Sequence, residues 1–385
     1  MIKIDPKKYQ KKYSETVNFK VPTSELSTVL GNIELDALKE DFEGIMNSLI
    51  SENIWDESYK YKKFLDQYIR LCLFLHDDLK SYSGSGIDLY YQVIDKIKDI
   101  PLVKNIYGVI DKNDYEKYVN DEVTFENFRK IINDKMKFIN GAAKNDKTKT
   151  PSVLPFNNAE YLFVNGKPKK YSYSSMTKEI RTEYFETLGI EVCPYCNHGF
   201  IDVVTPDNKA INTFELDHFY PQSIFPLLAF SLYNFVPSCK SCNQTFKKDS
   251  IEVKDAINPI IESFGTEVTF IVSPDSSGKN YEVDFEFNNC SSEKKKKCET
   301  SDKIFALRAR YSCHQNYIKD VIKKKRDYGD SFRNKIKESL RKLRLDDSEE
   351  TINKMIYGLE FNEEEDKIYI MSKFTRDILD NYKEK

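Results

Sequence analysis

Four of the eight cysteines occur in two closely spaced pairs, Cys193-Pro-Tyr-Cys196 and Cys239-Lys-Ser-Cys242. The tight turn of a CxxC segment directs both sulfur atoms to one point, and two such turns complete the tetrahedral thiolate set that zinc prefers. Because four sulfurs leave no open coordination position, we expect a structural Zn²⁺ ion and not a catalytic one. The alternative, a redox-active dithiol in one pair, leaves the other pair unexplained and lacks the βαβ context of such motifs.

The segments between and after these pairs carry polar residues that suit hydrolysis, namely Asp217, His218, Asn234, Asn243 and Lys247. A neutral imidazole accepts a proton from water near physiological pH. Carboxylate and amide oxygens are good ligands for Mg²⁺ or Mn²⁺, and these cations activate phosphodiesters. An isolated Asp-His pair is more often an ordinary surface pair, so the interpretation depends on the cysteine framework around it.

Three segments in this order resemble the HNH endonuclease superfamily, the ββα-metal nucleases, in its four-cysteine form: FELDHFYP (214–221), LYNFVP (232–237) and CNQTFK (242–247). The resemblance covers residues 190–250, about a sixth of the chain. It implies that His218 is the general base and that Asp217 and Asn243 hold catalytic Mg²⁺ or Mn²⁺. Asn234 then orders the loop by hydrogen bonding, and a final Asn in place of His makes this the HNN variant. We interpret Lys247 as a phosphate contact.

The layout outside the motif resembles, more weakly, the HNH nucleases of Septu-type and retron antiphage systems. That resemblance implies a defence effector that works with an ATPase partner. Two alternatives stay open from the sequence. In the first, the Asp-His pair is vestigial and the protein is a zinc-ribbon adaptor for nucleic acid or protein. In the second, the nuclease is inactive until a partner or foreign nucleic acid releases it.

We predict an α+β fold that is mostly α-helical, with a zinc-stabilised ββα-metal nuclease module flanked by helical regions and a β-hairpin. Helical spacing of apolar residues predicts a helical region over 1–140, whose first 20 residues we expect to be loosely held, and a linker follows at 141–155. The nuclease module is assigned to 156–260. Alternating apolar residues around PDSSGKN predict a hairpin in 261–385, and helices follow it.

Charge is unevenly distributed in the last third of the chain. Residues 318–345 contain eleven Lys or Arg against four Asp or Glu, whereas 346–366 contain nine acidic residues and one lysine. One interpretation is that two solvated helix faces pair with each other. The other is a basic helix that contacts phosphate and that the acidic segment partly masks. In the second case the contacts include Lys323, Lys324, Lys325 and Arg326.

Overall composition excludes several classes of protein. The 385 residues have a net charge of −3, which argues against a histone-like binder but permits a local basic surface. No segment approaches the ~20 apolar residues needed to cross a bilayer, and the N-terminus has no apolar signal region. We therefore expect a cytoplasmic protein that acts on DNA without a membrane partner.

Overall fold

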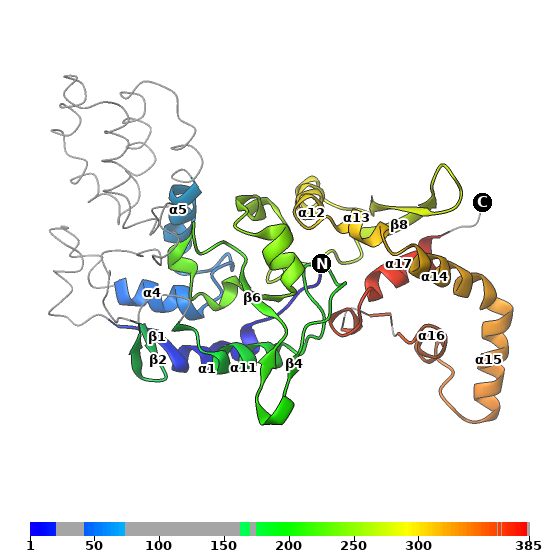
Figure 1. Ribbon diagram of the computed structural model, residues 1–385, viewed down its shortest axis with the longest axis horizontal. Coiled ribbons are helices and arrows are strands. Elements are labelled where there is room, and N and C mark those ends of the chain that lie inside the picture. The colour runs from blue at the N-terminus through cyan, green and yellow to red at the C-terminus, as the bar shows by residue number, and fades with distance from the viewer. Residues whose placement is uncertain (21–41, 74–161, 170–174, 360, 363, 383–385) are drawn as a thin grey trace, which may run out of the picture. The chain divides into compact units, whose positions relative to one another are not determined.

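The computed structural model describes residues 1–20, 42–73, 162–169, 175–359, 361–362 and 364–382 (Figure 1). The predicted linker at 141–155 lies outside these residues. By packing, the chain forms two units. Unit 1 contains Met1–Asp5, Thr182–Phe219 and Val236–Lys385, and unit 2 contains Pro6–Arg181 and Tyr220–Phe235. The chain leaves unit 1 after Phe219 and returns to it at Val236.

Unit 2 combines helices with a small antiparallel sheet. Its regular elements are α1 (Lys7–Thr16), β1 (Val17–Phe19), α4 (Phe42–Ser51), α5 (Lys62–Leu73), β2 (Leu162–Val164) and β3 (Lys167–Lys169). The strand order is β1-β2-β3, with Val17 opposite Val164. On α5, Leu65, Tyr68 and Cys72 are buried and share one face of the helix.

The expectation that the first 20 residues are loosely held is wrong. Tyr9 and Tyr13 lie four residues apart on α1 and are 2% and 1% exposed, and Phe19 of β1 is fully buried. Side chains four residues apart share one face of a helix, so both rings enter the same core. The many lysines of this segment lie between those positions, and they hid the apolar face in the sequence.

Unit 1 contains the segment that resembles a nuclease except for Tyr220–Phe235, which belongs to unit 2 and carries the loop turns η4 (Pro226–Leu228) and η5 (Leu232–Asn234). Helix α11 (Lys178–Leu188) crosses the boundary between the two units and leads to the first cysteine pair. The elements that follow are β4 (Val203–Val204), β5 (Ile211–Asn212), β6 (Glu215–His218), the loop turns η4 and η5, β7 (Phe235–Ser238), the π-helix η6 (Ser241–Lys247) and the 3-10 turn η7 (Ile251–Asp255). Strands β6 and β7 form one two-stranded sheet, and β4 and β5 form another.

The rest of unit 1 is the predicted hairpin followed by helices. Strand β8 (Val268–Pro274) pairs antiparallel with β9 (Tyr281–Phe287), from Val268 opposite Phe287 to Pro274 opposite Tyr281. The helices are α12 (Ser292–Phe305), α13 (Leu307–Ser312), α14 (Gln315–Asp327), α15 (Asp330–Lys342), α16 (Glu349–Tyr357) and α17 (Ser372–Asn381), with the short turn η8 (Glu365–Lys367) before the last. The hairpin is confirmed, and the described residues combine helices with small sheets as predicted.

Aromatic side chains join the hairpin to the helices around it. The Phe270 ring centroid lies 4.7 Å from that of Tyr311 on α13 and 5.3 Å from that of Phe374 on α17. In Figure 1, β8, α13 and α17 lie together in unit 1. The Tyr311 hydroxyl donates to the carbonyl oxygen of Cys196 at 2.8 Å, so this core also supports the first cysteine pair. None of the described helices combines the length and apolar character that a membrane span requires.

Candidate metal centre and adjoining polar site

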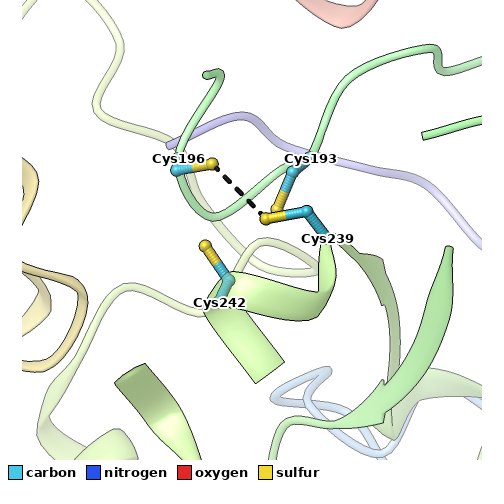
Figure 2. A group of neighbouring side chains, drawn as sticks. All are labelled: Cys193, Cys196, Cys239 and Cys242. Atoms are coloured by element: carbon cyan, nitrogen blue, oxygen red, sulfur yellow. Dashed lines mark hydrogen bonds between the residues drawn. The ribbon is translucent and has the colours of Figure 1, made fainter. Parts of the chain in front are cut away.

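The four cysteines of the two pairs converge in unit 1. Their Sγ atoms all lie within 4.8 Å of one another, and those of Cys196 and Cys239 are 4.0 Å apart (Figure 2). Zinc–sulfur bonds of about 2.3 Å in a tetrahedron place sulfurs roughly 3.8 Å apart. The cluster therefore fits a metal ion such as zinc.

The backbone of the first pair is held in a tight turn. The Asn197 amide donates to the Cys193 carbonyl at 2.8 Å, and the Cys193 amide donates to the Gly199 carbonyl at 2.9 Å. A Cβ atom on Gly199 would lie 3.2 Å from the Cβ of Cys239. Because few Cβ atoms tolerate so close a contact, a glycine at this position lets the two pairs approach each other.

Arg310 of α13 is a second contact of the cluster, and no motif in the sequence pointed to it. Its guanidinium donates to the Cys242 Sγ at 3.3 Å and lies 4.9 Å from the centre of the Phe246 ring. A hydrogen bond to a ligating sulfur orients the ligand and offsets the negative charge of a four-thiolate site. Arg310 thus links the C-terminal helices to the second cysteine pair.

Asp217 has two buried partners, and neither is Asn243. Its Oδ1 accepts from the Lys247 ammonium at 2.9 Å, and its Oδ2 accepts from the Tyr195 hydroxyl at 2.6 Å. Lys247 is 1% exposed and Asp217 is 5% exposed. Burial raises the pKa of Asp217, and the positive charge of Lys247 opposes that shift. This placement does not support Lys247 as a phosphate contact, because its charge is enclosed by protein and paired.

Asn243 lies instead beside Glu215, a residue that we did not predict from the sequence. The Asn243 Nδ2 atom donates to Glu215 Oε2 at 2.9 Å, and Gln244 donates to Glu215 Oε1 at 2.5 Å. Glu215 and Asp217 lie two residues apart on β6, and both side chains bind residues of η6. The signal for Glu215 was present in its spacing of two residues from Asp217.

His218 is 7% exposed and ends β6. The Lys247 ammonium also donates to the His218 carbonyl oxygen at 2.7 Å, so one side chain holds both the Asp217 carboxylate and the backbone at His218. Asn234 is fully buried in unit 2 and orders its loop as expected. Its side-chain amide accepts from the Tyr220 amide at 2.8 Å and donates to the Tyr220 carbonyl at 3.0 Å.

The predicted basic residues of α14 are only partly available. Lys323 is exposed, whereas the Lys325 ammonium donates to the Tyr382 carbonyl at 2.6 Å. The Lys324 Nζ atom lies 3.7 Å from Asp320 Oδ2, and the Arg326 Nε atom lies 3.5 Å from Asp327 Oδ1, so both charges are paired with a carboxylate.

The acidic segment pairs with α15. Glu349 contacts both Arg333 and Lys337, and Arg341 lies 2.6 Å from Asp347. This arrangement fits the interpretation of two helix faces that pair with each other.

Comparisons with protein-family models, curated proteins and solved structures gave no match, so the chemistry of the site is argued from its own residues.

Proposed function

We propose that the protein is a metal-dependent endonuclease that hydrolyses DNA phosphodiester bonds, with His218 as the general base. The observation that carries the proposal is the order of elements around the cysteine cluster. Strand β6 ends at Asp217 and His218 and pairs with β7, and β7 leads through the second cysteine pair into η6. A strand, a strand and a helix closed by four cysteines is the unit that the resemblance to HNH nucleases implies.

In this proposal the four cysteines hold a structural Zn²⁺ ion. Four sulfurs complete its coordination and leave no position for substrate. Since zinc joins the turn before β4 to the start of η6, zinc binding contributes to the folding free energy of unit 1. The ion would act on catalysis only by holding β6 beside η6.

The oxygen atoms that fit a divalent cation belong to Glu215 and Asn243. Glu215 is half-buried and accepts from two neutral amides, so no charge in these contacts offsets its own. Rotation of the Asn243 side-chain amide by 180° exchanges the positions of its nitrogen and oxygen atoms, so that the oxygen, which can bind a cation, takes the place of the nitrogen. Asp217 can join them only after the Lys247 ammonium moves away, because both carboxylate oxygens already accept hydrogen bonds. Bound there, Mg²⁺ or Mn²⁺ would polarise the phosphate and stabilise the leaving oxygen.

A second function is favoured by one specific observation. The buried pair of Lys247 and Asp217 neutralises the carboxylate that the family resemblance assigns to the metal. A protein with that arrangement fixed in place would be a zinc-dependent adaptor that binds nucleic acid or protein without turnover. An antiphage role and an ATPase partner are further proposals, and they rest on the sequence resemblance alone.

Supercoiled plasmid incubated with Mg²⁺, Mn²⁺ or EDTA tests the proposal. The wild type should nick or cut the plasmid only with a divalent cation, and His218→Ala should be inactive while it retains the zinc content of the wild type. Equal cleavage by both proteins would show that His218 is not the base. If neither protein cleaves and both bind the plasmid equally, the adaptor is the better interpretation.

A further inference from the structure

The loop that follows His218 forms part of the core of unit 2. Residues Tyr220–Phe235 belong to that unit, whereas β6 before them and most of β7 after them belong to unit 1. Loops usually run over the surface of a protein. Here six residues of the loop are fully buried: Phe225, Leu228, Phe230, Ser231, Leu232 and Asn234. Unit 2 is therefore folded around a segment of the nuclease motif.

Tyrosine hydroxyls from two helices of unit 2 bind the backbone of this loop. Tyr13 of α1 donates to the Phe230 carbonyl at 2.8 Å. Tyr68 of α5 accepts from the Leu227 amide at 3.0 Å. Helix α4 packs against η4 and η5 of the same loop. These two hydrogen bonds come from residues more than 150 positions away in the sequence, so the loop conformation depends on the folding of the N-terminal helices.

Trp55, the only tryptophan of the chain, holds both ends of the loop. Its indole ring stacks on Tyr220 with ring centroids 5.0 Å apart. Its Nε1 donates to the Tyr233 carbonyl at 2.5 Å. Tyr220 is the second residue after His218, so only Phe219 separates the candidate base from a residue that unit 2 holds by its ring and, through Asn234, by its backbone.

We propose that Tyr13 and Trp55 are positioning residues for His218, and that they act through the loop that follows it. The inference rests on the proposed function, in which His218 is the general base. The imidazole direction depends on the backbone torsions at the end of β6. Trp55 and Asn234 hold Tyr220 beside the residues that lead into β7, and β7 pairs with β6, so the short stretch from His218 to Tyr220 is restricted at both ends. The N-terminal helices thereby receive a role, because they hold the loop that begins directly after the candidate base.

Two tyrosines of unit 2 provide a matched pair of variants in the full-length chain. Tyr13→Phe removes a hydroxyl that binds the loop, and Tyr59→Phe removes one that accepts from Ser48 Oγ at 3.0 Å. Both side chains are buried, at 1% and 6% exposure, so the two substitutions cost similar stability. Trp55→Phe is a third variant, which keeps an aromatic ring but loses the hydrogen bond to Tyr233.

The readouts are amide hydrogen exchange at Tyr220, the ¹³Cε1 NMR signal of His218 and plasmid cleavage. The chain has four histidines, and His218→Asn identifies the signal of His218 by its loss. Tyr13→Phe and Trp55→Phe should each speed exchange at Tyr220 about fivefold, the factor that corresponds to one hydrogen bond of ~1 kcal/mol. Both should shift the His218 signal and lower kcat with little change in KM. Tyr59→Phe should change none of the three.

The positioning role is overturned if the His218 signal is unchanged in Tyr13→Phe and Trp55→Phe, or if it moves equally in Tyr59→Phe. These NMR and exchange measurements need no turnover. Absence of cleavage by the wild type therefore rejects a nuclease that acts without a partner and leaves the positioning of His218 to be decided by the signal alone.

Discussion

Replacing Lys247 with methionine is the most informative perturbation of the candidate site. Methionine keeps most of the length and the apolar stem but removes the ammonium that lies 2.9 Å from Asp217 Oδ1 and 2.7 Å from the His218 carbonyl oxygen. Asp217, 5% exposed, then loses its cationic partner and retains the hydrogen bond from the Tyr195 hydroxyl. Removing one member of a buried ion pair typically costs ~3–5 kcal/mol, because the remaining charge has lost its partner.

The loss should depend on pH in a defined direction. Burial raises the pKa of Asp217, and Lys247 lowers it, so Lys247→Met raises the pKa further. A carboxyl whose pKa is higher in the folded state than in the unfolded state stabilises the fold while it is protonated, and that contribution is lost as pH rises through the folded pKa. The deficit of Lys247→Met relative to wild type should therefore be largest at pH 7.5 and smaller at pH 5.5.

Urea unfolding followed by circular dichroism, with wild type and variant compared at each pH and with zinc in excess, measures this deficit. The double variant Lys247→Met, Asp217→Asn removes both charges and should recover part of the loss, and the cycle gives the coupling energy of the pair. A deficit below about 1 kcal/mol at pH 7.5, or one that does not shrink on acidification, would refute the assignment of a buried, functional ion pair.

Three other substitutions test the surroundings of the site. Gly199→Ala should lower the free energy of unfolding by about 1–3 kcal/mol in urea titrations, because its methyl group would overpack the contact between the two cysteine pairs; wild-type stability would show that the contact relaxes freely. Arg310→Gln should weaken zinc retention about 10–100-fold against a chelator, since it loses the bond to Cys242. Arg308→Gln, on the same helix but paired with aspartates, is its control. Glu349→Gln removes the negative charge that pairs with Arg333 and Lys337 of α15. The plot of log DNA affinity against log salt concentration should then become steeper by about 0.9 for each additional phosphate that the protein neutralises. An unchanged slope contradicts masking by this segment.

Features encoded by local spacing could be predicted from the sequence. The hairpin of β8 and β9 follows from alternation on both sides of a turn, and its pairing from Val268 to Pro274 agrees with that pattern. The cysteine cluster follows from two CxxC turns, because the turn itself directs the sulfurs. The hairpin depends on residues close together in the chain, and the cysteine cluster depends on the preference of one metal ion for four sulfur ligands.

The position of Lys247 could not be predicted in the same way. Counting along an α-helix from Asn243 places Lys247 one turn further on the same face, beside a bound phosphate. The segment is a π-helix, in which the Lys248 amide donates to the Asn243 carbonyl five residues earlier at 2.9 Å. Asn243 and Lys247 nevertheless both reach β6, at Glu215 and Asp217 respectively. What the sequence did not indicate is that β6 presents a buried carboxylate to Lys247, because that pairing depends on how β6 and η6 pack and not on the spacing along η6.

The packing of the N-terminal helices on the loop after His218 could not be predicted either, because the periodicity of a sequence describes one helix or strand and not the elements that pack against it. The bond from Tyr13 to Phe230 spans 217 positions and the one from Trp55 to Tyr233 spans 178. Neither the lysine-rich N-terminal segment nor the apolar loop after His218 can bury its apolar side chains by itself. Together they form one core, which explains why the N-terminal segment is ordered and why the loop after His218 is buried.

Charge at the end of β6 separates the two candidate functions. Lys247 balances Asp217 inside the protein, whereas Glu215 of the same strand is held by the neutral amides of Asn243 and Gln244. In either function Glu215 joins β6 to η6 through these two amides, and only in the nuclease would its carboxylate also bind a divalent cation. The ion pair serves either function, because Lys247 holds the Asp217 side chain and the His218 carbonyl oxygen together. The adaptor and the nuclease therefore differ at Glu215, and divalent-cation binding there is the property that distinguishes them.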